Sequence, residues 1–189
     1  MRMQHGTQEP SGWIRRWSHL LPAGGTVLDV ACGAGRHMRW LARLGHAVTG
    51  VDRDPDALGA AAAFGRAVQA DIENGPWPFA GQAFDGVVVT NYLWRPLWPT
   101  LLGALAPDGV LLYETFAEGQ AAIGKPSRPE FLLRHGELLQ LCRELRIVAY
   151  EDGFLDAPPR LVQRIAAVRT GPADGRARHR LQIESAIPE

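Results

Sequence analysis

Two carboxylates flank a turn of small residues near the N-terminus, and their spacing fits a site for a nucleoside. Residues 27–30 are apolar enough for a buried strand, Asp29 lies within them, and residues 31–35 follow as the turn. Small side chains let the backbone bend tightly and leave its N–H groups open to a ligand. A second strand, residues 47–51, ends at Asp52. In nucleotide-binding βαβ units an acidic residue at this place accepts hydrogen bonds from the ribose hydroxyls. The spacing therefore predicts a nucleoside-bearing ligand.

The glycine spacing of the turn argues against a dinucleotide. A dinucleotide site needs a third glycine, three residues after the second, so that helix and strand can pack closely over the pyrophosphate. Met38 occupies that position after Gly35. A nicotinamide-dependent reductase is one alternative, but the chain has no Tyr-x-x-x-Lys pair for a proton relay, and Lys125 is its only lysine. An ordinary strand-to-helix turn without a ligand is another.

Length and composition predict one folded domain. The chain has 189 residues, 46% of them hydrophobic and 21% charged, and a formal net charge of zero, which argues against disorder and against a general polyanion-binding surface. Cys32 and Cys142 fit no metal-ligand or disulfide pattern. No signal peptide or membrane span is recognisable, so we expect a cytoplasmic protein. We expect a flexible segment at residues 1–10, the folded domain at 11–169 and an unstructured tail at 170–189.

Alternating strand-like and helix-like segments predict an α/β domain. Residues 84–90 form an almost continuous apolar run, which is typical of a parallel strand covered on both faces. Residues 147–150 and 161–168 are joined without a helix, so they must pair antiparallel, because a parallel partner needs a crossover of about a dozen residues or more. The other expected strands are residues 67–70 and 109–116, and the expected helices are residues 13–20, 36–44, 55–65, 98–105 and 129–145.

The turn resembles a known cofactor-binding signature. From Asp29 to Gly35 the sequence follows the acid-x-G-x-G-x-G pattern of class I S-adenosylmethionine-dependent methyltransferases, with Ala31 in place of the first glycine. An alanine allows the same close approach if its φ is negative. The resemblance implies S-adenosyl-L-methionine as the cofactor. It also implies a Rossmann-like domain with a seven-stranded, mostly parallel sheet in the order 3-2-1-4-5-7-6, the last strand antiparallel, and helices on both faces.

Further stretches resemble a narrower group, the small bacterial methyltransferases similar to the tellurite-resistance type. They are the Gly-Arg-His end of the turn, residues 92–96, residues 113–116 and residues 131–134. The motifs of this group are specific for cofactor binding and say little about the methyl acceptor. The Asn/Asp-Pro-Pro-aromatic sequence of enzymes that methylate amino groups of nucleic acids is absent, because residues 90–93 read Thr-Asn-Tyr-Leu.

The resemblance assigns cofactor roles to residues near the ends of the predicted strands. It implies that Asp71 bonds to the adenine amino group and that Ile72 lies on the ring. Arg36 is a candidate for the cofactor carboxylate, because a cation in the first turn of a helix is unfavourable unless an anion is near; a solvent-facing arginine is the alternative. Trp13 either touches the methionine end or only packs in the core. The predicted cofactor-binding residues are Trp13, Asp29, Ala31, Cys32, Gly33, Gly35, Arg36, Asp52, Arg53, Asp71, Ile72 and Thr90.

The methyl acceptor is expected at the carboxyl ends of the central strands. No catalytic base is assigned. A sulfonium methyl group is already electrophilic, so a soft acceptor such as a thiol, a selenol or a tellurium oxyanion needs little help from a base. The predicted acceptor-facing residues, each of which could instead be a packing or salt-bridge residue, are Tyr92, Arg95, Glu114, Phe116 and Arg134.

These observations predict a methyltransferase that acts on a small molecule. We expect no nucleic-acid or membrane partner, no metal, and a monomer or weak dimer. A non-catalytic S-adenosylmethionine-binding protein is the alternative, because the sequence shows the cofactor pocket more clearly than the acceptor pocket.

Overall fold

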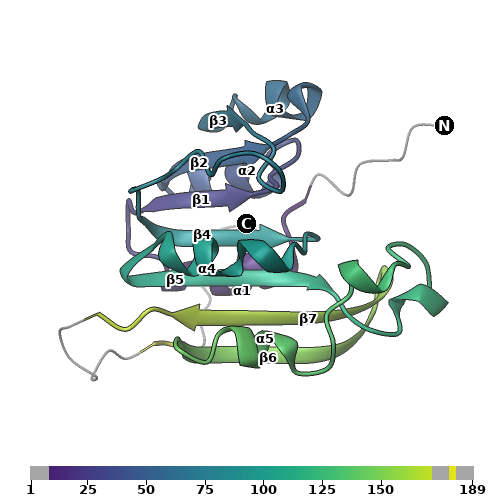
Figure 1. The fold of residues 1–189 in the computed structure, drawn as a ribbon. Coiled ribbons are helices and arrows are strands. Elements are labelled where there is room, and N and C mark those ends of the chain that lie inside the picture. Colours follow the sequence, from purple (N-terminus) through teal and green to yellow (C-terminus); the bar gives the residue numbers. More distant parts are fainter. Residues whose placement is uncertain (1–8, 172–178, 182–189) are drawn as a thin grey trace.

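Seven strands form one sheet in the computed structural model, which describes residues 9–171 and 179–181 (Figure 1). The strands are β1 (Thr26–Val30), β2 (Ala47–Asp52), β3 (Arg66–Gln69), β4 (Phe84–Thr90), β5 (Leu105–Phe116), β6 (Arg146–Asp156) and β7 (Pro159–Val168). Their order is β3-β2-β1-β4-β5-β7-β6. β1 to β5 are parallel, and β7 is antiparallel to both β5 and β6. The predicted fold class and strand order are therefore confirmed.

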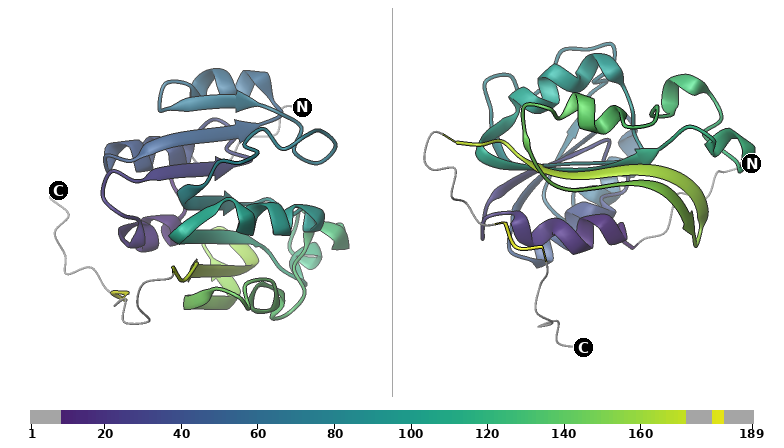
Figure 2. Two further views of the ribbon diagram at one scale, coloured as in Figure 1. Left: turned by 60° about the vertical axis from the view of Figure 1, so that its left-hand side comes forward. Right: turned by 90° about the horizontal axis from the view of Figure 1, so that it is seen from below.

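Helices cover both faces of this sheet (Figure 2). The helices are α1 (Gly12–Trp17), α2 (Arg36–Arg43), α3 (Pro55–Ala61), α4 (Trp98–Gly103) and α5 (Glu137–Leu141), with short 3-10 helices at η1 (Ser18–Leu20), η2 (Arg95–Leu97), η3 (Gln120–Ala122) and η4 (Pro129–Phe131). Buried residues of α1, α2 and α3 belong to one hydrophobic cluster, and those of α4 and α5 belong to a second. The first three helices therefore pack on one face, and the last two pack on the other.

The central strands are apolar at nearly every position because both of their faces are buried. In β4, Val88 belongs to the cluster under α1, α2 and α3, whereas Val87 and Val89 belong to the cluster under α4 and α5. Successive side chains of a strand point to opposite faces, so a strand covered on both sides needs an apolar residue at each position. This packing explains the continuous apolar run in the sequence.

Three predicted helices differ from the observed ones. The helix expected over residues 55–65 ends at Ala61. α4 ends at Gly103, and Leu105, expected as its last apolar residue, begins β5 and pairs with Phe84. The helix expected over residues 129–145 is instead η4 and α5. Gly136 lies between them with a φ of +71°, and this left-handed conformation interrupts a right-handed helix.

Parts of both predicted terminal segments lie outside the described residues. These are residues 1–8 of the N-terminal segment and residues 172–178 and 182–189 of the tail. Within the part of the chain that the structure describes, no helix is both long and apolar enough to cross a membrane.

Candidate active site

A cavity of about 430 Å³ lies at the carboxyl ends of β1, β2, β4 and β5. Ligands bind at this edge in open α/β sheets. Of the predicted acceptor-facing residues, Tyr92 and Phe116 line the cavity. The predicted cofactor-binding residues that line it are Ala31, Asp52, Arg53, Asp71 and Ile72. The structure thus brings together residues from both predicted sets.

The turn after β1 passes through left-handed backbone conformations. The φ angle is +54° at Ala31, +52° at Gly33 and +77° at Gly35. Glycine adopts such angles freely, whereas an alanine is strained there by roughly 1–2 kcal/mol. Ala31 therefore lacks the negative φ under which an alanine replaces a glycine without strain. Asn91, a second cavity residue with a positive φ (+54°), directly follows β4.

Replacing Ala31 by glycine should stabilise the protein, by up to about 1 kcal/mol, because glycine relieves the left-handed strain while its greater freedom in the unfolded chain offsets part of the gain. Urea unfolding of the ligand-free protein measures the change. Ala34 in the same turn has no positive φ, so Ala34→Gly is a matched control that should lower the free energy of unfolding. A loss of stability in both variants would contradict the strain at Ala31.

Asp52 lies at the tip of β2 with its carboxylate against the turn. Its Oδ2 accepts a hydrogen bond from the Gly33 N–H (2.8 Å), and its Oδ1 accepts one from the Asp54 N–H (3.0 Å). The Gly33 N–H, expected to be open to a ligand, is therefore bonded to Asp52. A carboxylate has about four acceptor sites, so Asp52 retains the capacity to accept from two ribose hydroxyls.

Asp71 lines the cavity and also closes the loop after β3. Its Oδ1 accepts from the backbone N–H groups of Glu73 and Asn74, and its Oδ2 accepts from the Asn74 side-chain amide. These bonds fix the carboxylate next to Ile72, which also lines the cavity. The two residues predicted to contact adenine therefore share one wall.

Asp29, Arg36 and Thr90 form a polar group behind the turn. Arg36 Nη2 donates to Thr90 Oγ1 at 3.3 Å. Asp29 is 1% exposed, and its Oδ2 has no hydrogen-bond partner. Burial raises the pKa of Asp29 to about 7, against the lowering effect of the Arg36 charge. A buried oxygen without a partner is unfavourable, and an ammonium group placed beside it would satisfy it.

Trp13 and Cys32, both predicted to contact the cofactor, are buried away from the cavity wall. Trp13 Nε1 donates to the Ile165 carbonyl of β7 at 3.1 Å, and the Arg164 guanidinium lies 5.0 Å from the centre of its ring. Burial raises the pKa of the Cys32 thiol, which keeps it protonated. Across residues 9–171 and 179–181, no group of three or more His, Cys, Asp or Glu side chains could hold a metal ion.

Two predicted acceptor-facing residues instead contact Glu137. Arg95 donates from Nε and Nη2 to the two Glu137 oxygens (2.7 and 2.9 Å) and from Nη1 and Nη2 to the carbonyls of Glu130 and Leu132. The Arg134 guanidinium lies 3.6 Å from Glu137, and its side chain is 70% exposed. Neither arginine lines the cavity.

Replacing Arg95 by alanine should lower the free energy of unfolding by about 3 kcal/mol, because Glu137 is buried and would lose two charged hydrogen bonds. The matched control is Arg134→Ala, which removes an exposed partner of the same carboxylate and should change stability by less than about 1 kcal/mol. Urea unfolding of both variants measures the difference. If Arg95→Ala kept wild-type stability and raised the KM for the acceptor, the acceptor-facing role would be correct.

Three residues that were not predicted to face the acceptor line the cavity together with Tyr92 and Phe116, and we call these five residues the acceptor end. Thr115 lies on β5, Pro126 comes from the loop after β5, and Phe131 comes from η4. Pro126 lies in an aperiodic loop, residues 117–128, that follows a central strand, and loops of this kind often cover a site. Glu114, expected at this end, is fully buried and does not line the cavity.

Known proteins share this fold. Residues 27–109 match a family model described as a methyltransferase domain. TehB from Haemophilus influenzae superposes with a TM-score of 0.66 at 18% identity, over 81% of this chain and 60% of TehB. Residues 27–109 thus match a methyltransferase domain, and the chain has the fold of the class I methyltransferases. A TehB-like S-adenosylmethionine-dependent methyltransferase from Corynebacterium glutamicum superposes with a TM-score of 0.63 at 21% identity, over 84% of this chain and 88% of that one.

Similarity at such low sequence identities establishes the fold of the chain, but it does not identify the methyl acceptor. The [4+2]-cyclase SpnF has the same fold, with a TM-score of 0.64 at 18% identity over 84% of this chain and 78% of SpnF. No curated protein matches the chain significantly in sequence. Family and fold together support a methyltransferase and imply S-adenosylmethionine as its cofactor. The unpartnered Oδ2 of Asp29 fits the amino group of this cofactor.

Proposed function

We propose that this methyltransferase transfers the methyl group of S-adenosylmethionine to a small molecule that attacks through a thiol or another soft nucleophile. The composition of the acceptor end of the cavity carries this proposal. Phe116, Pro126 and Phe131 are apolar, and Thr115 and Tyr92 are neutral. Among the described residues that line the cavity there is no histidine and no lysine. Its carboxylates are Asp52 and Asp71, which we assign to the cofactor, and Glu73, whose charge adds to the effect of burial in raising the pKa of Tyr92.

The chain would act by holding the cofactor and by excluding water. When bound, S-adenosylmethionine supplies an electrophilic methyl group. Asp52 would hold the ribose, Asp71 the adenine amino group, and Arg36 the carboxylate, while the apolar end aligns the nucleophile with the S–CH₃ bond. Burial raises the pKa of Tyr92, so its phenol stays protonated and can donate a hydrogen bond but cannot accept a proton. A thiol needs no protein base, because roughly a few per cent of it is thiolate at pH 7.

A thiol or a selenol fits this end better than a tellurium oxyanion. An oxyanion binds best to cationic donors. Arg95 already donates to Glu137 and to two backbone carbonyls, and Arg53 lines the cavity next to Asp52, at the expected position of the ribose. The acceptor end therefore favours a neutral, apolar body around the nucleophilic atom.

Binding of S-adenosylhomocysteine should tighten roughly tenfold as the pH rises from 6 to 8, because the buried Asp29 carboxyl has a pKa of about 7. The ammonium group of the ligand favours the ionised carboxylate, so binding releases protons near pH 7, and affinity falls as the pH falls through 7. Calorimetric titration in buffers of different ionisation enthalpy measures both quantities. The dependence should disappear in Asp29→Asn. A wild-type affinity that is constant from pH 6 to 8 would contradict this role of Asp29.

A turnover assay tests the proposed function. The protein is incubated with S-adenosylmethionine and a panel of thiols, selenols, tellurite, phenols and amines, and formation of S-adenosylhomocysteine is measured. We expect product with thiols or selenols, and much less with the Asp52→Ala variant as control when S-adenosylmethionine is limiting. Product with only phenols or amines would overturn the soft-acceptor proposal.

A non-catalytic S-adenosylmethionine-binding protein is the second candidate. The [4+2]-cyclase SpnF shares the fold, so this fold occurs in proteins with activities other than methyl transfer. Tight binding of S-adenosylmethionine without product from any acceptor of the panel would favour this candidate.

A further inference from the structure

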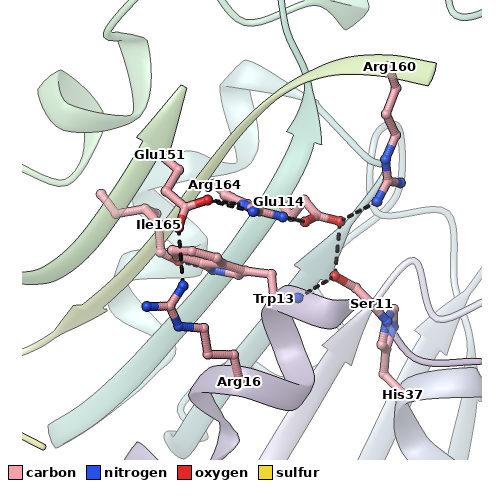
Figure 3. Close-up of polar contacts among 9 residues, drawn as sticks. All are labelled: Ser11, Trp13, Arg16, His37, Glu114, Glu151, Arg160, Arg164 and Ile165. Carbon is pink, nitrogen blue, oxygen red and sulfur yellow. Dashed lines mark hydrogen bonds and ion pairs between the residues drawn. The ribbon is translucent and has the colours of Figure 1, made fainter. Parts of the chain in front are cut away.

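Glu114 is a buried charge for which the proposed chemistry has no use. It is 0% exposed and pairs in register with Thr90 of β4 and Arg164 of β7. Its Oε1 accepts from Ser11 Oγ (3.0 Å) and Arg160 Nη2 (3.4 Å), and its Oε2 accepts from Arg164 Nη1 (3.3 Å) (Figure 3). Such partners are what a buried carboxylate requires. With three donors around it and no exposed surface, the Glu114 carboxylate cannot serve as a base for an acceptor in the cavity.

Ser11 joins three elements of the structure at this carboxylate. Its hydroxyl donates its only hydrogen to Glu114 on β5 and accepts from the Trp13 N–H (3.1 Å), which caps α1. Its backbone N–H donates to His37 Nε2 on α2 at 3.2 Å. One serine therefore fixes the start of α1 against both the sheet and the helix that follows the cofactor turn, as Figure 3 shows.

His37 connects Ser11 to two predicted cofactor-binding residues, Thr90 and Arg36. Burial lowers the pKa of His37 to about 3, so the ring is neutral. Because Nε2 accepts from Ser11, the proton lies on Nδ1, which donates to Thr90 Oγ1 at 3.4 Å. Arg36 Nη2 donates to the same oxygen at 3.3 Å. Thr90 Oγ1 thus accepts twice, and its own hydrogen remains available for a ligand.

We propose that Glu114 is a positioning residue for the cofactor: through Ser11 and His37 it orients Thr90 and Arg36 toward the methionine end. This inference rests on the proposed function, since it takes these two residues as cofactor contacts. According to this proposal, Glu114 affects the affinity for the cofactor and does not contact the methyl acceptor. Loss of the carboxylate should release Ser11, and then the His37 ring, from their present orientation.

Glu151 provides a matched control. It belongs to the same row of charges as Glu114, which is made of Arg16, Glu151, Arg164, Glu114 and Arg160. It accepts from Arg164 Nε at 2.8 Å and pairs with Arg16 at 3.3 Å (Figure 3). It shares Arg164 with Glu114, and its hydrogen bonds and ion pairs go to Arg16 and Arg164, not to Ser11 or His37. Glu151→Gln therefore perturbs the ion pairs of the row and leaves the path to the cofactor site intact.

Calorimetry with S-adenosylhomocysteine tests the proposal. We expect Glu114→Gln and Ser11→Ala each to weaken binding roughly tenfold or more, Ser11→Thr to restore it, and Glu151→Gln to stay within about twofold of wild type. The acceptor KM should stay within about twofold in the Ser11→Ala variant at saturating cofactor. Nitrogen-15 NMR should show the Nδ1–H tautomer of His37 in the wild type and a changed tautomer ratio in both weakened variants.

Two results would overturn the positioning role. One is wild-type affinity for S-adenosylhomocysteine in folded Ser11→Ala protein. The other is a raised acceptor KM with unchanged cofactor affinity in Glu114→Gln, which would place this carboxylate at the acceptor. Should Glu114→Gln fail to fold, Ser11→Ala keeps every charge of the cluster and decides the question. Failure of the proposed function would give a different result. If the wild-type protein formed no methyl-transfer product but its binding of S-adenosylhomocysteine still depended on Ser11, the positioning role would hold and the proposed function would not.

Discussion

Binding of S-adenosylhomocysteine should weaken roughly 100-fold when Asp52 is replaced by alanine, a loss of about 3 kcal/mol. Asp52 lines the cavity at the tip of β2, and we propose that its carboxylate accepts from the two ribose hydroxyls. Each hydrogen bond to a charged acceptor is worth about 1.5–3 kcal/mol. Asp52 also bonds to the Gly33 N–H, so its removal loosens the turn and adds to the loss. Calorimetric titration measures the affinity.

A ligand comparison separates these two effects of Asp52. The wild-type protein should prefer S-adenosylhomocysteine to its 2′,3′-dideoxy analogue, and Asp52→Ala should bind the two about equally. Asp54→Ala is the matched control, because Asp54 caps α3 two residues away and does not line the cavity; it should keep wild-type affinity. If folded Asp52→Ala protein still discriminated between the two ligands, the ribose would bind elsewhere.

Replacing Glu114 by alanine should lower the free energy of unfolding by about 3–5 kcal/mol, because removal of one partner leaves buried charges uncompensated. Arg160 and Arg164 have side chains that are 19% and 17% exposed, and both are paired with Glu114. The Ser11 hydroxyl would lose its acceptor as well. Urea unfolding, followed by circular dichroism, measures the change.

Glu151→Ala is the control for this stability effect. The Glu151 side chain is 43% exposed, and its loss still leaves Arg164 paired with Glu114. Its removal should change the free energy of unfolding by less than about 1 kcal/mol. Equal losses in the two alanine variants would show that burial does not set the strength of these ion pairs.

The sequence by itself determined the fold and the edge of the sheet at which Asp52 lies. Apolar runs such as residues 84–90 encode central strands because every position of a doubly covered strand is buried. The connection between residues 147–150 and 161–168 is too short for a parallel crossover, which fixed the antiparallel strand. Asp52 could be placed because the carboxyl ends of consecutive parallel strands meet at one edge of the sheet. These are local patterns and chain connectivity, which a single sequence contains.

Only the tertiary structure decided the partners of the charged side chains. Glu114 and Ser11 are separated by 103 positions, and Arg95 and Glu137 by 42. No periodicity relates such residues, so the sequence could not distinguish an acceptor contact from a buried ion pair. The left-handed φ of Ala31 is likewise set by the bend that joins β1 to α2, where packing of the whole sheet outweighs the local preference of an alanine.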